Sequence, residues 1–225
     1  HLISLMVIDE VTALRSLTAA LTTACHITHQ RDPETGSHLD RMSRYSKLLA
    51  RKLAKGHNLS DEYIEHVFMF APLHDIGKVA IPDRILLKQG PLDEEERHIM
   101  NTHAEKGQEI IDHMIANFDL SSLQHIDILR NIARFHHEAI DGRGYPDQLK
   151  ADAIPLEARI VAVADVFDAL TSKRPYKEAW DLDTAYQELK RLSGTRLDAE
   201  CVQIMLECRD EIDKIMSSFP ENELG

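Results

Sequence analysis

Histidines and acidic residues gather in five short segments of this 225-residue chain. Imidazole nitrogens and carboxylate oxygens are ligands that divalent metals commonly take in proteins. Several of these residues fall where a helix is expected to end or a glycine turn to begin, so ligands from separate segments can converge there. The candidates are Glu34 with His38, His74 with Asp75, His103, the pair His136 and His137, and Asp165. The pattern predicts a metal centre assembled from distant parts of the chain.

The spacing within two of these segments indicates how metal ions can be held. Glu34 and His38 are four residues apart, so both can face one ion if a helix begins near Glu34. His74 and Asp75 are adjacent, so the carboxylate can bridge two ions while the imidazole binds one of them. Two ions about 3.5–4 Å apart hydrolyse phosphate esters, because one activates water and both stabilise the transition state. The set contains no thiolate, which favours iron or manganese over a structural zinc ion.

The composition excludes several other classes of protein. Lysine and arginine total 26 against 38 for aspartate and glutamate, and the net charge of −12 argues against a long nucleic acid as partner. The three cysteines, Cys25, Cys201 and Cys208, have an odd count and no CxxC spacing, which predicts a reducing, cytoplasmic setting. No apolar run approaches the roughly 18 residues that span a bilayer, so we expect no membrane contact by this fragment.

The elements that must position these residues are expected to be helices. Glycine (9) and proline (8) are scarce and clustered, and apolar residues recur every three or four positions. For the apolar stretch over 160–170 we predict a helix rather than a buried strand, because of its alanines and its length. The sequence predicts an all-α fold, with helices over 7–27, 38–53, 60–73, 93–114, 126–136, 160–170, 184–192 and 199–216.

Helix ends are predicted from capping residues. Ser60 is expected to begin one helix, and Gly77 to cap its C-terminus, which would deliver His74 and Asp75 at the last turn. Asp93 followed by Glu96 three residues later predicts a capping box, and we expect that helix to run past His103 towards residue 114.

Four motifs together resemble the HD-GYP family of the HD metal-dependent phosphohydrolases. They are HDIGK at 74–78, HHE at 136–138, DGRGYP at 141–146 and ADVFDALTSKRPY at 164–176. The resemblance runs from about Arg31 through the helix after Pro175. It implies a helical bundle of the HD phosphohydrolase type, with two or three divalent metal ions. It also implies hydrolysis of the bacterial messenger cyclic di-GMP to linear pGpG, and in some members to GMP, by a hydroxide that bridges two metals.

The same resemblance assigns roles to individual residues. Lys78 matches a phosphate-contacting lysine and, with His74 and Asp75, forms the expected catalytic group. Glu34 matches the acidic residue that allows a third metal. Independently of the resemblance, Asp168 lies three residues after Asp165, and we expect it to anchor a neighbouring imidazole or to cap a helix rather than to bind a metal. The implied metal ligands are Glu34, His38, His74, Asp75, His103, His136, His137 and Asp165, and the implied substrate contacts are Lys78, Arg143, Gly144, Tyr145, Arg174 and Lys177.

The chain departs from the family pattern at residues 194–200. These read GTRLDAE, where the family commonly has a Gly-Thr-x-Phe-Asp-Pro stretch. We expect this difference to affect local packing near the C-terminus. It should leave intact the metal centre and the loop that carries the DGRGYP motif at 141–146, called the GYP loop below.

Two domains are predicted, together with alternatives for the function. Residues 1–24 are expected to be a connector helix from an upstream sensory or receiver domain of a two-component system, and to support a homodimer. The alternative for this first helix is an ordinary amphipathic helix that packs on its own domain. Residues 25–225 are expected to form the HD-GYP phosphodiesterase domain. The alternatives are a hydrolase of another dinucleotide, such as hybrid cyclic GMP-AMP or pGpG, and a slow or silent cyclic-dinucleotide receptor.

Overall fold

Helices build the described part of the chain, which contains no β-strand beyond a single bridge between Ser193 and Leu197. The computed structural model describes residues 19, 23, 36–117, 125–173 and 178–220. The prediction of an all-α fold is confirmed. The helices are α2 (Gly36–His57), α3 (Asp61–Phe70), α4 (Asp83–Leu86), α5 (Glu94–Asn101), α6 (His103–Asn117), α7 (Ile126–Phe135), α8 (Leu156–Thr171), α9 (Leu182–Leu192), α10 (Ala199–Glu207) and α11 (Arg209–Ser218), with 3₁₀ turns η1 (Ala71–Leu73), η2 (Ile76–Ala80) and η3 (Ala151–Ala153).

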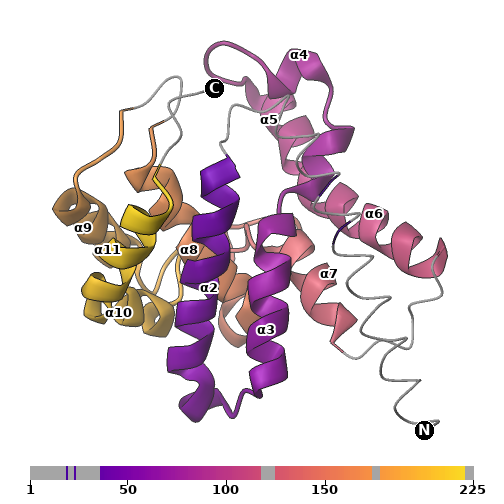
Figure 1. Ribbon diagram of the computed structural model, residues 1–225. Helices are drawn as coiled ribbons and strands as arrows, with labels where there is room; N and C mark the ends of the chain where they lie inside the picture. Colours follow the sequence, from indigo (N-terminus) through magenta and orange to yellow (C-terminus); the bar gives the residue numbers. More distant parts are fainter. Residues whose placement is uncertain (1–18, 20–22, 24–35, 118–124, 174–177, 221–225) are drawn as a thin grey trace, which may run out of the picture.

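The arrangement centres on α2 and α8. Helix α2 packs against α3 on one side and against α8 behind it, and α7 packs against both α8 and α6 (Figure 1). Helices α9, α10 and α11 gather on the opposite side of α2 from α6 and α7 (Figure 1). The 3₁₀ turn η2 lies against α6. Helices α2 and α7 contact η1, so α2, α6 and α7 all lie next to the segment between η1 and η2.

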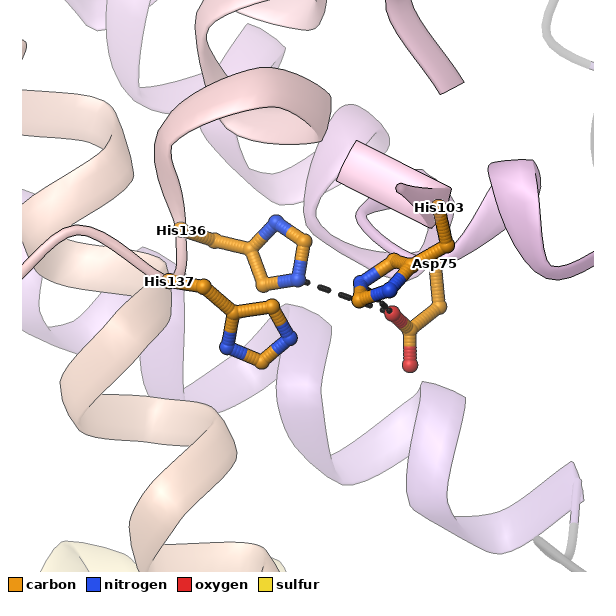
Figure 2. Close-up of side chains that lie close together, drawn as sticks. All are labelled: Asp75, His103, His136 and His137. Carbon is orange, nitrogen blue, oxygen red and sulfur yellow. Dashed lines mark ion pairs between the residues drawn. The ribbon is translucent and has the colours of Figure 1, made fainter. Parts of the chain in front are cut away.

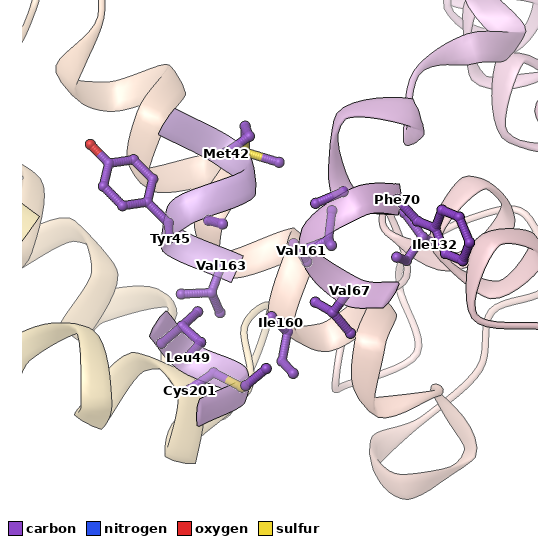
Figure 3. Packing of buried hydrophobic residues seen from close by; sticks show 14 of the residues in the cluster. Met42, Tyr45, Leu49, Val67, Phe70, Ile132, Ile160, Val161, Val163 and Cys201 are labelled. Atoms are coloured by element: carbon purple, nitrogen blue, oxygen red, sulfur yellow. The ribbon is translucent and has the colours of Figure 1, made fainter. Parts of the chain in front are cut away.

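Helix α8 forms the middle of the hydrophobic core. Ile160, Val161, Val163 and Phe167 are all fully buried. Ile160, Val161 and Val163 point to different sides of the helix (Figure 3). A helix that buries apolar side chains on several sides belongs in the interior of a protein. The prediction of a buried helix over 160–170 is confirmed.

Two predicted helices are each divided in two. The helix expected over 93–114 ends at Asn101 and restarts at His103, because Thr102 donates both its backbone N–H and its hydroxyl to Ile99 O (3.1 and 2.7 Å). The break makes His103 the first residue of α6. The helix expected over 199–216 is likewise divided at Cys208 into α10 and α11.

Gly77 does not cap a helix, and this prediction was wrong. Helix α3 already ends at Phe70, and Gly77 lies inside η2. A Cβ atom at Gly77 would lie 1.9 Å from the carbonyl oxygen of His103 and 2.5 Å from the backbone nitrogen of Gly107. Glycine is needed there because η2 touches the backbone of α6, and this contact brings Asp75 towards His103.

The two predicted N-terminal caps are confirmed. The Ser60 hydroxyl accepts a hydrogen bond from Tyr63 N, and Asp93 and Glu96 form a reciprocal capping box.

The predicted helix over 7–27, and the connector over 1–24, lie outside the described residues apart from positions 19 and 23. Within the described ranges, no helix is both long enough and apolar enough to cross a bilayer.

Candidate metal centre

One group of possible ligands surrounds Asp75. One ligand atom from each of Asp75, His103, His136 and His137 lies within 4.8 Å of the others. Asp75 Oδ1 is 3.1 Å from His103 Nε2 and 3.5 Å from His136 Nε2, and Figure 2 shows the imidazoles grouped around the carboxylate. Asp75 lies between η1 and η2, His103 begins α6, and the two adjacent histidines follow the end of α7. Three separate segments therefore meet at one point.

A second group adjoins the first. His38 from α2, His74 from the turn after η1 and Asp165 from α8 place ligand atoms within the same 4.8 Å limit. His74 is the chain neighbour of Asp75, and its Nε2 is 3.4 Å from Asp75 Oδ2. Its ring centroid is 5.0 Å from that of His136, in the first group. The two groups therefore share a boundary at the His74–Asp75 pair.

The imidazoles are held so that Nε2 faces the centre. In three of them Nδ1 bonds to a backbone carbonyl oxygen, which can only accept: His74 to Ala71 (2.8 Å), His103 to Met100 (2.8 Å) and His136 to Ile132 (2.9 Å). In these three rings Nδ1 must carry the proton, and Nε2 keeps the lone pair that binds a metal.

Buried polar atoms at this centre lack hydrogen bonds within the described part of the chain. They are Nε2 of His103, Nε2 of His136 and Oδ1 of Asp75. Buried polar groups without a partner are costly and rare in native proteins. A divalent cation would satisfy these atoms together, so the donor set fits the metal that the sequence predicts.

The charges at the centre also suit metal binding. Burial lowers the pKa of His136 and holds the pKa of His137 well below its usual value. Burial opposes ionisation of Asp75, but Lys78 and His74 outweigh it and hold the pKa of that carboxyl well below its usual range. Lys78 Nζ is 2.9 Å from Asp75 Oδ2. These shifts favour neutral imidazoles at His136 and His137 and a carboxylate at Asp75, which are the forms that bind metals.

Asp168 fixes the orientation of the His38 ring by bonding to its Nδ1 atom. This fully buried carboxylate accepts hydrogen bonds from His38 Nδ1 (2.7 Å), Arg41 Nε (2.6 Å) and Ser172 Oγ (3.0 Å). Burial alone would raise the pKa of Asp168, but His38 and Arg41 lower it to about 2. The prediction that Asp168 anchors an imidazole is confirmed. The sequence reasoning missed Arg41, whose only signal is that it follows His38 by three residues on one helix.

The GYP loop borders the same centre. The ring of Tyr145 lies 4.8 Å from that of His137. A Cβ atom at Gly144 would lie 2.3 Å from the backbone nitrogen of Ala139, so the close fold of this loop requires glycine. The Arg143 side chain is 83% exposed and is paired with Asp141, so its guanidinium reaches solvent rather than the ligand groups.

Glu138 shapes this loop. The HHE motif includes this residue, but the sequence reasoning gave it no role of its own. Its buried carboxylate accepts hydrogen bonds from the backbone nitrogens of Asp147 (2.7 Å) and Leu149 (3.0 Å). Three other predicted site residues, Glu34, Arg174 and Lys177, lie outside the described residues. Their roles, and the third metal that Glu34 would support, stay predictions.

Comparison with protein families and curated relatives identifies the chain. The HD domain family matches residues 32–201. The cyclic di-GMP phosphodiesterase response regulator RpfG of Xanthomonas campestris is 46% identical over 189 residues, which are 84% of this chain and 47% of that protein. The 3'3'-cGAMP-specific phosphodiesterase 2 of Vibrio cholerae is 40% identical over 191 residues, 85% of this chain and 34% of that protein. The matched region is thus less than half the length of each of these relatives.

Two solved structures share the fold at low sequence identity. A cyclic GMP-AMP specific phosphodiesterase of V. cholerae, V-cGAP3, aligns with a TM-score of 0.53 and 22% identity, over 92% of this chain and 51% of that chain. Bd1817, described as an HDG"Y"P protein from Bdellovibrio bacteriovorus, aligns with a TM-score of 0.55 and 18% identity, over 79% of this chain and 54% of that chain. With the motifs, the ligand groups and these matches together, the chain belongs to the HD domain family, in its HD-GYP group.

Proposed function

We propose that this chain is the catalytic part of a metal-dependent phosphodiesterase that hydrolyses cyclic di-GMP to pGpG. The observation that carries the proposal is the pair of adjoining ligand groups, which meet at His74 and Asp75. The name of the Xanthomonas relative, a cyclic di-GMP phosphodiesterase, supports the choice of substrate.

The metal ligands and Lys78 would have different roles in hydrolysis. Divalent ions at this site supply the means to lower the pKa of water and to stabilise charge on a phosphoryl group. Asp75 lies between the two groups and His74 beside it, so both ions would depend on this pair. Lys78, ion-paired with Asp75, carries an ammonium group at the edge of the centre, where it would neutralise charge on a phosphoryl oxygen. The nitrogen and oxygen ligands support iron or manganese as the metal.

The test replaces the two residues at the shared boundary. The wild-type protein, purified without oxygen and supplied with Fe²⁺ or Mn²⁺, should convert cyclic di-GMP to pGpG. The double variant His74→Ala with Asp75→Ala should lose bound metal and hydrolysis together, because it removes a ligand from each group. Metal content by mass spectrometry and product formation by chromatography measure both.

The matched control is His57→Ala. His57 is a partly exposed histidine at the far end of α2 that pairs with Glu200 (2.7 Å). The His57→Ala variant should keep the wild-type metal content and the wild-type rate of cyclic di-GMP hydrolysis. Hydrolysis by the double variant at the wild-type rate would contradict the proposed centre.

Hybrid cyclic GMP-AMP is the second candidate substrate. It is favoured by the 40% identity to a V. cholerae protein named as specific for 3'3'-cGAMP. The ratio of kcat/KM for cyclic di-GMP, cyclic GMP-AMP and pGpG, measured on one metal-loaded preparation, decides between them.

We further propose that an upstream regulatory domain controls this chain and that the N-terminal helix supports a homodimer. The regulatory domain is supported by the name of the Xanthomonas relative, a response regulator more than twice the length of the matching region.

We also propose that the protein works in the cytoplasm. Cys201 and Cys208, which are buried and free, support a reducing compartment.

A further inference from the structure

A cavity of about 420 Å³ opens beside the first ligand group, next to His137 and Tyr145. Its volume falls within the range of roughly 300–1,000 Å³ that is usual for small-molecule sites. His137 belongs both to the Asp75 group and to the lining of the cavity. A ligand can therefore extend from the metal centre into this space.

The far wall of the cavity includes the connection between α9 and α10, and backbone hydrogen bonds tie this connection to the GYP loop. Asp141 N donates to Thr195 O (2.8 Å). Gly194, at a φ of +72°, turns the chain so that its N–H reaches Leu197 O (2.8 Å). The position of Arg196 is thereby fixed relative to Tyr145 by the fold.

Three arginines line the cavity, although the chain as a whole has a net charge of −12. Arg143 is neutralised by Asp141, and Arg191 by Glu188, each at 2.6 Å. Arg196 has no ion pair and no side-chain hydrogen bond among the described residues. The cavity therefore holds one cationic side chain that is ready to take an anion.

We propose that this cavity binds the half of the cyclic dinucleotide that is not cleaved, with Arg196 as the contact to its phosphodiester. The inference rests on the proposed function. The scissile phosphodiester has to reach the imidazoles and carboxylates of the ligand groups. The second phosphodiester belongs to the same small ring, so it must lie close by, and the cavity beyond His137 provides the space. A guanidinium offers planar, paired donors that suit phosphate oxygens, and Arg196 gives up no existing partner to bind them.

The direct test is Arg196→Ala in the full chain. The side chain is exposed, so thermal stability and metal content should match the wild type. We expect the KM for cyclic di-GMP to rise about tenfold while kcat stays within about twofold, because the contact holds the substrate equally in the ground and transition states. The Kd for pGpG, measured by calorimetry, should rise by about the same factor. Arg196→Lys should recover part of the loss, because lysine keeps the charge but not the paired donors.

Two controls separate this role from a general effect of charge or of the metal centre. Arg51→Ala removes an exposed arginine on α2 that is 13 residues from His38, or about 20 Å along the helix, and should leave KM unchanged. The small substrate bis(p-nitrophenyl) phosphate has one phosphodiester and no second half, so the Arg196→Ala variant should hydrolyse it at the wild-type rate.

The outcomes distinguish this inference from the proposed function. If the wild type hydrolyses cyclic di-GMP and Arg196→Ala keeps its KM and its Kd for pGpG, the cavity assignment is overturned and the proposed function stands. Slower hydrolysis of bis(p-nitrophenyl) phosphate by that variant would also overturn the assignment, since Arg196 would then act at the cleaved bond. A wild type that cleaves bis(p-nitrophenyl) phosphate but no cyclic dinucleotide overturns the proposed function, and this inference with it.

Discussion

At the residue scale, the second ligand group, which contains His38, depends on Asp168. This carboxylate is fully buried and holds two side chains of α2, the imidazole of His38 and the guanidinium of Arg41. Arg41 also donates to the backbone oxygen of Phe219 (3.0 Å), just after α11. The orientation of a ligand is therefore linked to the packing of the last described helix.

We predict that Asp168→Asn weakens both the fold and the metal site. The substitution preserves the shape but leaves the buried Arg41 without its anion, and breaking a buried pair typically costs about 3–5 kcal/mol. Groups that orient a metal-ligating histidine are commonly worth about 10–100-fold in metal affinity. Denaturant unfolding of the metal-free protein measures the first effect, and metal titration measures the second.

Asp183→Asn is the matched control for this substitution. Asp183 is 81% exposed and pairs with Arg209 at 3.1 Å, and a surface pair of this kind contributes about 0–1 kcal/mol. It should keep full metal affinity. Wild-type stability and metal affinity in Asp168→Asn would show that His38 is oriented without this carboxylate.

At the element scale, the contact between η2 and α6 joins two of the ligand-bearing segments. Asp75 immediately precedes η2, and His103 begins α6. The backbones of the two elements come so close at Gly77 that no side chain fits between them. Packing of backbone on backbone therefore sets the distance between these two ligands.

Gly77→Ala should separate η2 from α6. Its methyl group would overlap the carbonyl oxygen of His103, and overpacking of this kind costs about 1–3 kcal/mol. We expect a lower melting temperature and a lower metal occupancy, because Asp75 and His103 would move apart. Differential scanning calorimetry and metal analysis check the two effects.

Gly56→Ala is the matched control, because it adds the same methyl group at a position where no backbone atom is in the way. We expect no loss of stability. Gly56 lies in α2, where a Cβ atom would meet only Glu200 Oε1, at an ordinary 3.7 Å. Alanine is the better helix former by about 1 kcal/mol, so this variant should be as stable as the wild type or more so. Equal behaviour of the two variants would rule out the steric account of Gly77.

At the scale of the whole molecule, the buried imidazoles couple stability to pH. Burial lowers the pKa of His136 and of His137, whereas both titrate near 6.5 in an unfolded chain. Below about pH 6.5 the unfolded chain therefore binds protons that the folded chain does not. The free energy of unfolding consequently decreases as the pH is lowered.

The melting temperature of the metal-free protein should accordingly fall between pH 7.5 and 5.5. His137→Gln should fall less steeply over this range, because it removes one of the groups that bind protons on unfolding. Bound metal should be released over the same range, since protons compete for the ligands. Equal slopes for the variant and the wild type would contradict this account.

The sequence by itself determined the helical class, most of the helix positions and the chemical nature of the site. Apolar periodicity, the caps at Ser60 and Asp93 and the alanines within 160–170 act within a few residues of one another, so their effect can be predicted from local sequence. The motifs also identified the histidines and carboxylates that the structure brings together.

Only the tertiary structure decided how these parts meet, because the deciding contacts join residues that are far apart in the chain. Asp168 and Arg41 are separated by 127 positions, and no local pattern indicates their pairing. Gly77 reads as a cap until the backbone of α6 lies against it, and the helix breaks at Thr102 and Cys208 interrupt patterns that look continuous. The cavity at Arg196 exists because the connection after α9 folds back onto the GYP loop. Packing between elements, and not local preference, fixed these features.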